Sequence, residues 1–329
     1  PYQNEKQKNN NYDDNLRNIV NQYVKEKSLN VFKTDVLEMF LRSSIQQAYA
    51  TSLDNLSLWW WDTWGESFWD TEVFLHEGYT AVFEAHASPV KSKIETQAVV
   101  TKINYKKGKV KVTYTDADGT KQLIRAKKVL VTVPLGVLKA NVIKFRPKLP
   151  GNHRRSIKQL GMGTLNKIHM IWNTDDIFWP SRVQWFGEYN RRETSFEFFN
   201  PYSLNGGLPL LSGFVAGDEA VYLEEQYGND QSKYEWEMEK RAMLALRNMF
   251  GQNIPNPKKI YVTKWRTDPY SQGSYSYNKV NMHKDARKRL RKSVRKRLYF
   301  AGEATNTDYH STTHGAYLSG LAAANEIAG

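Results

Sequence analysis

The stretch over residues 297–327 constrains the fold more than any other part of the chain. A short apolar run at 298–300 predicts a buried strand, because the run stops at Gly302. A polar loop follows, and the hydroxyl side chains at 311–313 are suited to cap a helix that begins near Gly315. Because a helix N-terminus has unpaired N–H groups and about half a positive charge, this end suits an anion or an electron-rich ring carbonyl.

The first turn of this predicted helix contains two small residues, Gly315 and Ala316. A flat ligand could therefore approach the backbone closely at this point. From the residues alone, two interpretations are about equally supported. One is a binding site for an anion or a ring at the helix end, and the other is an ordinary strand–loop–helix corner.

The composition excludes several classes of site. A length of 329 residues predicts two domains and is sufficient for a buried core. The chain contains no cysteine, which excludes disulfides, thiolate metal sites, a cysteine nucleophile and a thioether link to a flavin. We identify no metal site. No run of about eighteen apolar residues occurs, so no transmembrane segment is expected, and no targeting signal indicates a compartment.

Positive charge is concentrated near the C-terminus. The net charge is +13, and residues 284–298 contribute +8 of it through nine Lys or Arg and one Asp. We favour a solvated helix or loop face for this segment. The alternative is a docking patch for phosphate, nucleic acid or an acidic partner.

The N-terminal part predicts two amphipathic helices, over residues 14–27 and 36–50. A cluster of tryptophans and acidic residues follows them: Trp59, Trp60, Trp61, Trp64, Trp69, Asp62, Glu66, Asp70 and Glu72. Core packing is the default for such a cluster. An amine-binding wall is the alternative, because aromatic faces and carboxylates both attract ammonium groups.

The C-terminal stretch resembles a known family. Gly302-Glu-Ala-Thr followed by Tyr309-His-Ser-Thr-Thr-His-Gly-Ala is similar to the C-terminal flavin motif of the flavin-containing amine oxidases, and most similar to that of the polyamine oxidases. The resemblance implies that the helix end points at the pyrimidine side of FAD and stabilises negative charge on the reduced flavin. It assigns cofactor binding to Gly302, Glu303, Thr312, Gly315 and Ala316. It also places Ser311 and Thr312 beside the substrate.

The same resemblance extends to a strand near the middle of the chain. The strand that ends in proline within residues 129–139 matches a family signature, which assigns cofactor binding to Thr132 and Pro134. By alignment, Val100 falls where the backbone of the family contacts the adenine of FAD.

Two more segments of the resemblance concern catalysis. Lys167 matches the lysine that holds a water beside flavin N5 in these enzymes, whereas the residues alone equally allow a lysine that extends to solvent from a strand end. Residues 265–277 match the return of the chain to the FAD domain, which places Trp265 at the cofactor and Tyr277 beside the substrate. Thr312 stands where the family has the partner of Tyr277. The aromatic cage is therefore expected to be open on one side.

The resemblance predicts a mixed α/β (α+β) fold of two domains: part of a Rossmann-like FAD-binding domain, and a substrate domain with a mixed β-sheet flanked by helices. Residues 1–75 are assigned to the helical part of the substrate domain and 76–145 to the FAD-binding domain. Residues 146–267 are assigned to the substrate domain again, and 268–329 return to the FAD-binding domain.

The N-terminal strand–helix unit of the family, with its Gly-x-Gly-x-x-Gly motif, does not occur in these residues. That unit normally binds the FAD pyrophosphate. Gly161-x-Gly163 does not replace it, because Asn166 stands where the third glycine would be. We expect a polypeptide with this motif to complete the protein, either upstream in the same gene product or as another chain. The remaining alternative is a cofactor site that has been lost.

The implied function is oxidation of amines, most simply polyamines, with non-covalent FAD. Hydride passes from the carbon next to the neutral amine to flavin N5, water hydrolyses the imine, and O2 reoxidises FAD to give H2O2. Since a polyamine site favours acidic surroundings, we expect the basic segment 284–298 to lie away from the active site.

Three alternatives to polyamine oxidation remain at the sequence level. An amino-acid oxidase would need an arginine that binds the substrate carboxylate, and no motif identifies one. A lysine-demethylase-like enzyme would act on methylated lysine in a protein. A flavin-free relative would serve as a scaffold or subunit, with the basic segment as its contact.

Overall fold

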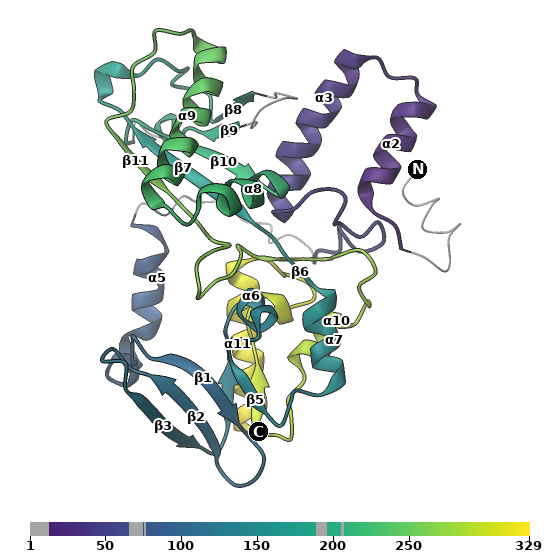
Figure 1. Cartoon of the computed structure of the whole chain (residues 1–329), viewed down its shortest axis with the longest axis vertical. Helices are drawn as coiled ribbons and strands as arrows, with labels where there is room; N and C mark the ends of the chain where they lie inside the picture. Colours follow the sequence, from purple (N-terminus) through teal and green to yellow (C-terminus); the bar gives the residue numbers. More distant parts are fainter. Residues whose placement is uncertain (1–12, 66–74, 76, 189–195, 205–206) are drawn as a thin grey trace.

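The computed structural model describes residues 13–65, 75, 77–188, 196–204 and 207–329, and these form two lobes (Figure 1). The upper lobe contains a five-stranded sheet and the N-terminal helices. The lower lobe contains a β-meander, two further short strands and the C-terminal helix. This arrangement confirms the expected mixed α/β class.

The sheet of the upper lobe is antiparallel throughout, in the order β11-β7-β10-β9-β8. Its strands are β7 (Leu165–Ile171), β8 (Trp185–Glu188), β9 (Phe196–Phe199), β10 (Leu210–Ala216) and β11 (Lys259–Val262). Alternate residues of each strand point to opposite faces, so one face carries buried apolar side chains such as Ile168, Met170 and Phe198. This apolar face is covered by two helices, α8 (Asp218–Tyr227) and α9 (Gln231–Phe250).

The local sequence explains where helix α9 begins and ends and which of its sides is buried. The side chain of Asp230 accepts a hydrogen bond from the N–H of Lys233 and caps the helix, and Gly251 ends it at a φ of 100°. Buried residues recur at helical spacing along the side that faces the sheet: Tyr234, Met238, Ala242, Ala245 and Leu246. The opposite side stays exposed to solvent.

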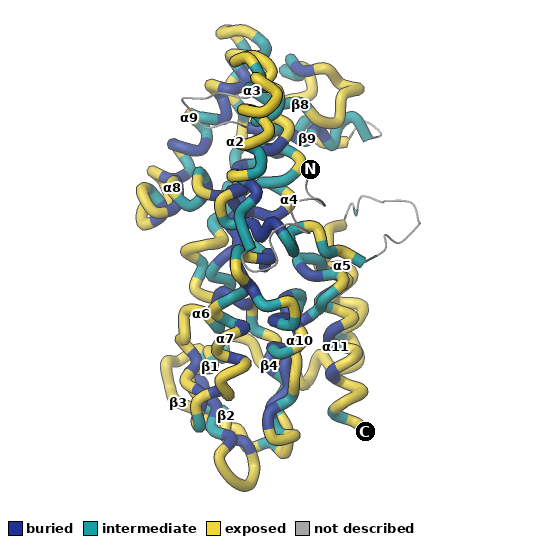
Figure 2. Tube along the Cα trace, turned by 90° about the vertical axis from the view of Figure 1, so that its right-hand side faces the viewer, coloured by how far each residue is buried: buried dark blue, intermediate teal, exposed yellow. Residues whose placement is uncertain are grey.

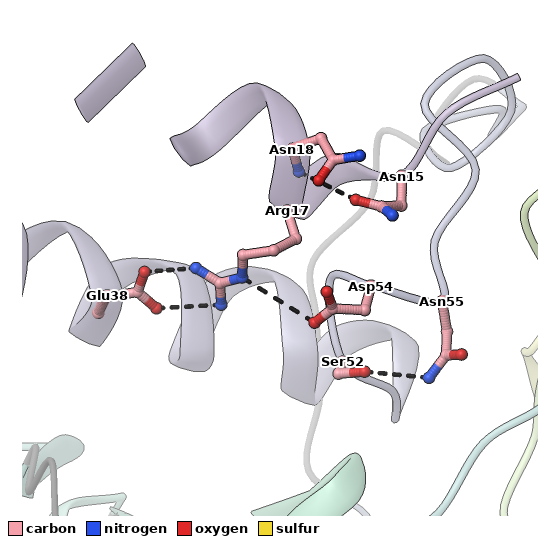
Figure 3. Close-up of polar contacts among 7 residues, drawn as sticks. All are labelled: Asn15, Arg17, Asn18, Glu38, Ser52, Asp54 and Asn55. Carbon is pink, nitrogen blue, oxygen red and sulfur yellow. Dashed lines mark hydrogen bonds and ion pairs between the residues drawn. The ribbon is translucent and has the colours of Figure 1, made fainter. Parts of the chain in front are cut away.

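The two expected N-terminal helices are α2 (Leu16–Glu26) and α3 (Val31–Leu41), and α3 continues through a π-helical turn, η1 (Arg42–Gln46), into α4 (Gln47–Tyr49). The guanidinium of Arg17 donates to both carboxylate oxygens of Glu38, at 2.5 and 3.2 Å (Figure 3). It also lies 4.0 Å from the carboxylate of Asp54. Arg17 therefore connects both helices to the loop that follows them.

The lower lobe is built on a four-stranded sheet in the order β3-β2-β1-β5. Its strands are β1 (Val99–Asn104), β2 (Val110–Thr115), β3 (Lys121–Ala126) and β5 (Lys144–Arg146). The first three form an antiparallel meander, and β5 pairs with β1 in parallel. Helix α5 (Gly78–Ala87) and the 3-10 helix η2 (Ser88–Lys93) precede the meander.

A second, smaller sheet pairs β4 (Val129–Val131) in parallel with β13 (Leu298–Phe300). All three residues of β13 are buried, as the apolar run predicted. In the described part of the chain each of these two strands has only one neighbouring strand. Strands that are buried on both faces usually lie inside a larger parallel sheet, so this pair has the character of an incomplete one.

Short elements connect and cover these sheets. The helices are α6 (Leu135–Ala140), α7 (Gly151–Gln159), α10 (Ala286–Arg291) and α11 (Thr313–Ala328), and the 3-10 turns are η3 (Thr174–Asp176), η4 (Pro201–Ser203) and η5 (Glu303–Thr305). A short antiparallel pair, β6 (Gly161–Met162) and β12 (Ser276–Tyr277), joins distant parts of the chain. Much of α11 is exposed (Figure 2). Its exposed residues include the apolar Tyr317 and Leu321. Within the described residues, no helix combines the length and apolar character needed to span a bilayer.

Candidate functional site

A cavity of about 210 Å³ lies where β4, β13 and α11 meet. Five of the residues expected at the cofactor line it: Thr132, Pro134, Gly302, Glu303 and Ala316. They come from segments that are far apart in the sequence, and the parallel pairing of β4 with β13 brings their ends together. The described walls enclose less volume than a typical cofactor site of about 300–1,000 Å³.

The backbone at the cavity is open at Gly302. This residue has a φ of 129°, which an L side chain rarely adopts, and a Cβ there would find no atom nearer than 4.0 Å, the carbonyl oxygen of Thr132. A ligand can therefore lie against the bare backbone at this position. The N–H of Gly302 is held by the hydroxyl of Ser319 at 2.8 Å, which fixes the turn to α11.

Glu303 is held by three hydrogen bonds. Its carboxylate accepts from the N–H of Ser276 at 3.1 Å, from the hydroxyl of Ser276 at 2.7 Å and from the N–H of Ser311 at 2.7 Å. The hydroxyl of Ser311 in turn donates a short bond to the carbonyl oxygen of Ser276. Glu303 thus fixes the loop before α11 against β12.

The N-terminus of α11 is capped as the sequence predicted. Thr312 is the cap residue, and its hydroxyl oxygen accepts from the N–H of Gly315 at 3.0 Å while it donates to the carbonyl of Tyr309 at 2.7 Å. A Cβ at Gly315 would lie 1.7 Å from that same carbonyl oxygen. The loop therefore requires glycine at this position. Of the two small residues, Ala316 is the one that lines the cavity, and contact of a cofactor with the backbone of Gly315 stays a prediction.

Tyr277 lies on β12 and is almost completely buried. Its ring packs over Gly161, where a Cβ would come within 2.2 Å of the ring, and Leu53 and Leu56 belong to the same apolar cluster. Burial raises the pKa of its hydroxyl, against a hydrogen bond with Thr51 that lowers it. The described residues thus hold Tyr277 rigidly.

Lys167 and Trp265 lie together at one end of the five-stranded sheet. The N–H of Lys167 donates to the hydroxyl of Thr263 at 2.8 Å, and the N–H of Trp265 donates to the side-chain oxygen of Asn166 at 3.2 Å. The ammonium of Lys167 lies 5.2 Å from the centre of the Phe214 ring. Burial lowers the pKa of this lysine below its ordinary value.

These residues do not all lie in one place. Lys167, Trp265 and Tyr277 are absent from the residues that line the cavity at β4 and β13. Val100 is also outside it, because it lies on β1 opposite Tyr114 and packs against the core of the lower lobe.

Two residues on the polar face of the upper sheet, Glu197 and His169, were not predicted from the sequence. The register places Lys167, Phe214 and Glu197 in one row across β7, β10 and β9. In the next row, His169 and Ser212 make a side-chain hydrogen bond of 2.8 Å. A signal was present, since Glu197 and His169 are polar residues at alternate positions of otherwise apolar strands.

The pKa values of both Glu197 and His169 are shifted from their ordinary values. Burial raises the pKa of the Glu197 carboxyl, although a hydrogen bond with Gln47 lowers it. Burial, and then the positive charge of Lys167, lower the pKa of His169. The polar face therefore carries a carboxyl that holds its proton more strongly, and an imidazole that holds it less strongly, than in water.

Two small cavities lie between this polar face and the N-terminal helices. One of about 230 Å³ includes Asp54, Asp218 and Glu219 in its lining. The other, of about 150 Å³, includes Glu188 and Glu197. The side chains of Arg42 and Gln47 contribute to both. Arg17 also lines the first cavity, and the two arginines lie close to carboxylates, Arg17 4.0 Å from Asp54 and Arg42 3.4 Å from Glu219. Among the described residues, Asp218, Glu188 and Glu197 make no ion pair, so the linings keep an excess of acidic groups that suits a cationic ligand. Trp69, Glu66, Asp70 and Glu72 of the expected aromatic and acidic cluster lie outside the described residues.

Arg287 corrects the expectation that the basic segment lies away from the site. Its guanidinium is buried and donates to the side-chain oxygen of Asn278, the hydroxyl of Ser276 and the carbonyl of Ala304, at 2.7–3.2 Å. Burial lowers the pKa of Arg287 to about 10, against the attraction of Glu303, which raises it. The segment 284–298 therefore has an inner member that supports Ser276 and Glu303.

His310 completes this buried network. Its ring lies 4.6 Å from that of Trp64, and its Nε2 is 3.4 Å from the side-chain nitrogen of Asn278. Burial and the positive charge of Arg287 lower the pKa of His310 to about 2, although a hydrogen bond with the backbone of Thr63 raises it. The histidine is therefore neutral, and it precedes the two residues expected beside the substrate.

Comparison with known proteins agrees with this geometry. A sequence profile described as flavin-containing amine oxidoreductase matches residues 3–328. A lysine-specific histone demethylase 1 homolog of Oryza sativa subsp. japonica is 39% identical over 221 residues, which are 65% of this chain and 24% of that protein. Lysine-specific histone demethylase 2 of Homo sapiens is 31% identical over 324 residues, which are 95% of this chain and 38% of that protein.

A solved structure shows the same fold. It is a double mutant of putrescine oxidase made in a redesign of cofactor binding, with a TM-score of 0.70 at 17% sequence identity. The match covers 94% of this chain and 67% of the putrescine oxidase chain. The curated relatives are considerably longer, since this chain spans 24% and 38% of the two described above.

The two-lobed mixed α/β fold is the fold of the putrescine oxidase structure. The chain belongs to the flavin-containing amine oxidoreductase family. FAD is the cofactor of this family, and the cavity fits part of it, because Gly302 leaves bare backbone and Ala316 leaves space at the helix end. In addition, the N–H of Thr313 at the start of α11 has no hydrogen-bond partner within the described residues.

The buried arginine gives a first testable prediction. Replacing Arg287 with Gln should destabilise the protein by on the order of 3 kcal/mol, because hydrogen bonds to a charged group contribute about 1.5–3 kcal/mol each. Arg291→Gln, in the same helix but exposed, is the matched control and should change stability little. Chemical denaturation followed by tryptophan fluorescence measures both. Equal stability of the two variants would contradict the structural role of Arg287.

Proposed function

We propose that this chain supplies the flavin-ring side and the amine side of an FAD-dependent amine oxidase, with a polyamine as substrate. The observation that carries the proposal is the convergence of residues from β4, β13 and α11 on one cavity, beside a lobe whose polar face carries a half-buried lysine. Family membership supports the class of reaction, and the choice of polyamine is our own inference.

Residues of the cavity would hold and orient the cofactor. Gly302 and Ala316 give it room against the backbone, and Thr312 fixes the helix end whose positive partial charge favours an electron-rich ring. Glu303 acts through the loop, since its carboxylate holds Ser311 and Ser276 in place. When bound, FAD accepts hydride from the carbon next to the amine nitrogen.

Lys167 would hold or release a proton at the amine side. Because burial lowers its pKa, its Nζ gives up a proton more readily than an exposed lysine does. We propose that this nitrogen holds a water molecule near the reacting carbon. Thr263 fixes the backbone of Lys167, and the Phe214 ring lies beside the ammonium, so the nitrogen has a restricted position.

The acidic lining between the sheet and the helices supports a cationic substrate. Gln47 lines both cavities, of which one includes Glu197 and Glu188 and the other Asp218. A polyamine carries several ammonium groups along a thin chain, so one nitrogen can react while others meet these carboxylates. Tyr277 and Thr312 would border the reacting end, with Thr312 leaving one side open.

Methylated lysine in a protein is the second candidate substrate. The observation that favours it is the identity of 31–39% with proteins described as lysine-specific histone demethylases. A lysine side chain also presents a cationic amine on a thin alkyl chain, so the acidic lining suits it too. The two candidates differ in whether a peptide must enter the site.

The incomplete β4–β13 sheet supports a further part of the proposal. A strand that is buried on both faces normally has a neighbour on each side, and the exposed apolar face of α11 also needs cover. We propose that a segment with Gly-x-Gly-x-x-Gly packs beside this sheet, near Thr132 and Pro134, and binds the pyrophosphate of FAD at its helix end.

The division into domains also belongs to this proposal. Leu149 and Ile157, next to and within α7, pack in the core of the lower lobe together with β13. We therefore propose that residues up to the end of α7 belong with the FAD-binding segment 76–145. The substrate domain would then begin at β6 and run to about residue 267.

A test of the lysine uses Lys167→Met in the assembled flavoprotein. We expect FAD content to be unchanged. The rate of flavin reduction or reoxidation should fall by on the order of 10²-fold, which is the scale for loss of a group that transfers a proton. Lys259→Met, on the neighbouring strand β11, is the control and should leave both rates unchanged. Stopped-flow absorbance measures them. Wild-type rates in Lys167→Met would remove this role from the proposal.

A comparison of substrates distinguishes the two candidates. We expect spermine or spermidine to reduce the flavin faster than a peptide with methylated lysine at equal concentration. The rate should rise with pH, because only the neutral amine reacts and amines titrate near a pKa of ~10. Faster reduction by the peptide would favour the demethylase candidate, and no reduction by either would overturn amine oxidation.

Cofactor content tests the missing neighbour of the small sheet. Residues 1–329 expressed alone should be poorly soluble or free of flavin, because one wall of the site and an apolar surface are uncovered. Co-expression with a segment that carries Gly-x-Gly-x-x-Gly should give about one FAD per chain, measured by absorbance after gel filtration. A monodisperse monomer of this chain alone with stoichiometric FAD would be the contrary result.

A further inference from the structure

A long part of the lower lobe carries positive charge without any acid. Between Asp118 and the end of α7 at Gln159 the sequence contains eleven Lys or Arg and no Asp or Glu. This part includes β5 and α7, none of whose residues lines the cofactor cavity, and α6, which contributes Leu135 and Leu138 to that cavity. The charge therefore requires an explanation other than the amine site, which favours cations.

The structure gathers part of this charge around a cavity of about 500 Å³ between α6, β5 and α7. Four basic side chains line it, Lys144, Arg146, Lys148 and Arg154, and its lining includes no acidic residue. Each of the four residues is exposed. Like charges at such a site repel one another, so the arrangement is stabilised when an anion binds.

Two of these side chains are fixed and two are available. Lys144 donates to the carbonyl of Asn141 at 2.7 Å, and the Nε of Arg154 donates to the carbonyl of Leu149 at 3.1 Å, which leaves the end of the guanidinium toward solvent. The side chains of Arg146 and Lys148 make no hydrogen bond or ion pair with any described residue. The cavity thus offers partly ordered cations that lack a counter-charge.

The positive surface continues beyond the cavity on both sides. On one side, Tyr105 donates to the carbonyl of Lys148 at 3.1 Å, and the guanidinium of Arg295 lies 5.8 Å from the centre of the Tyr105 ring. On the other side, α7 packs against α10 (Figure 1), and the ring of His153 is 2.8 Å from the carbonyl oxygen of Lys292. The basic segment 284–298 therefore joins the same surface through its exposed members.

We propose that this basic surface, made by Lys144, Arg146, Lys148, Arg154, Lys292 and Arg295, binds the phosphate backbone of double-stranded nucleic acid. Lys and Arg side chains supply most phosphate contacts, and a surface wider than one cavity suits a repeating anion better than a single phosphate. The aromatic rings beside the cavity, Phe145 and Tyr105, are buried. Neither of these two rings is therefore offered at the cavity for stacking with the bases of a single strand.

The test measures binding of a fluorescently labelled DNA duplex to the soluble full-length protein by anisotropy, as a function of salt. The triple variant Arg146→Gln, Lys148→Gln, Arg154→Gln should bind about tenfold or more weakly. Its slope of log affinity against log salt should fall by about 0.9 for each lost phosphate contact. Amine turnover should not change, because none of the three residues lies in the amine or cofactor site.

A control variant has the same change in net charge on the upper lobe: Lys25→Gln, Lys27→Gln, Lys33→Gln. All three lysines are exposed on or next to α2 and α3, and the control should bind the duplex as the wild type does. Equal losses in both variants would show a general charge effect and overturn the proposal. Wild-type affinity in the triple variant would overturn it as well.

Three further ligands separate the proposed occupant from other anions. Single-stranded DNA of the same length, inorganic pyrophosphate and vesicles containing phosphatidylserine should each bind more weakly than the duplex. If the single strand or pyrophosphate binds as tightly, the site is not one for a duplex backbone. Vesicle binding that depends on the three residues, without duplex binding, would identify a membrane surface instead.

Discussion

The buried guanidinium of Arg287 is the interaction on which the rest of this structure depends. It connects α10 with Ser276 on β12 and with the carbonyl of Ala304 after β13, and through Asn278 it reaches the N-terminal tryptophan region. A charge with several hydrogen bonds in a buried position tolerates little displacement, because any lost bond leaves a desolvated charge. The two lobes therefore meet at a fixed point next to Glu303. The loop that leads to α11 is fixed there as well, because the N–H of Ser311 donates to Glu303.

The cofactor cavity follows from a second constraint, the parallel pairing of two three-residue strands. Parallel strands place their C-terminal ends at the same edge, so Thr132 and Gly302 meet although they are distant in sequence. The apolar residues of β13 make that pairing favourable, and Gly302 then allows the turn that no L side chain would readily follow. The chemistry of the site thus depends on small residues whose contribution is space, with Glu303 and Thr312 fixing the backbone around it.

Sequence analysis predicted the parts of the structure that are local. The apolar run at 298–300 and the hydroxyls at 311–313 were sufficient to place β13 and the cap of α11, because a strand end and a capped helix are decided by neighbouring residues. The row of Lys167, Phe214 and Glu197 was not predictable, since it depends on the register of three strands. Arg287 was misplaced because its charge suggested exposure, although Ala286 and Leu290 mark the inner face of α10 beside it. The expected positions of Val100 and Tyr277 came from family resemblance alone.

His310 has a consequence for the behaviour of the site in acid. The folded protein holds this imidazole neutral with a pKa near 2, whereas in an unfolded chain it would take up a proton below a pKa of about 6.5. Acidification below that value therefore favours the unfolded state, and the lost stability grows as the pH falls toward the folded pKa. At alkaline pH the ring carries no charge in either state. A compartment of low pH would thus lower the stability of the fold that holds His310 next to Ser311 and Thr312.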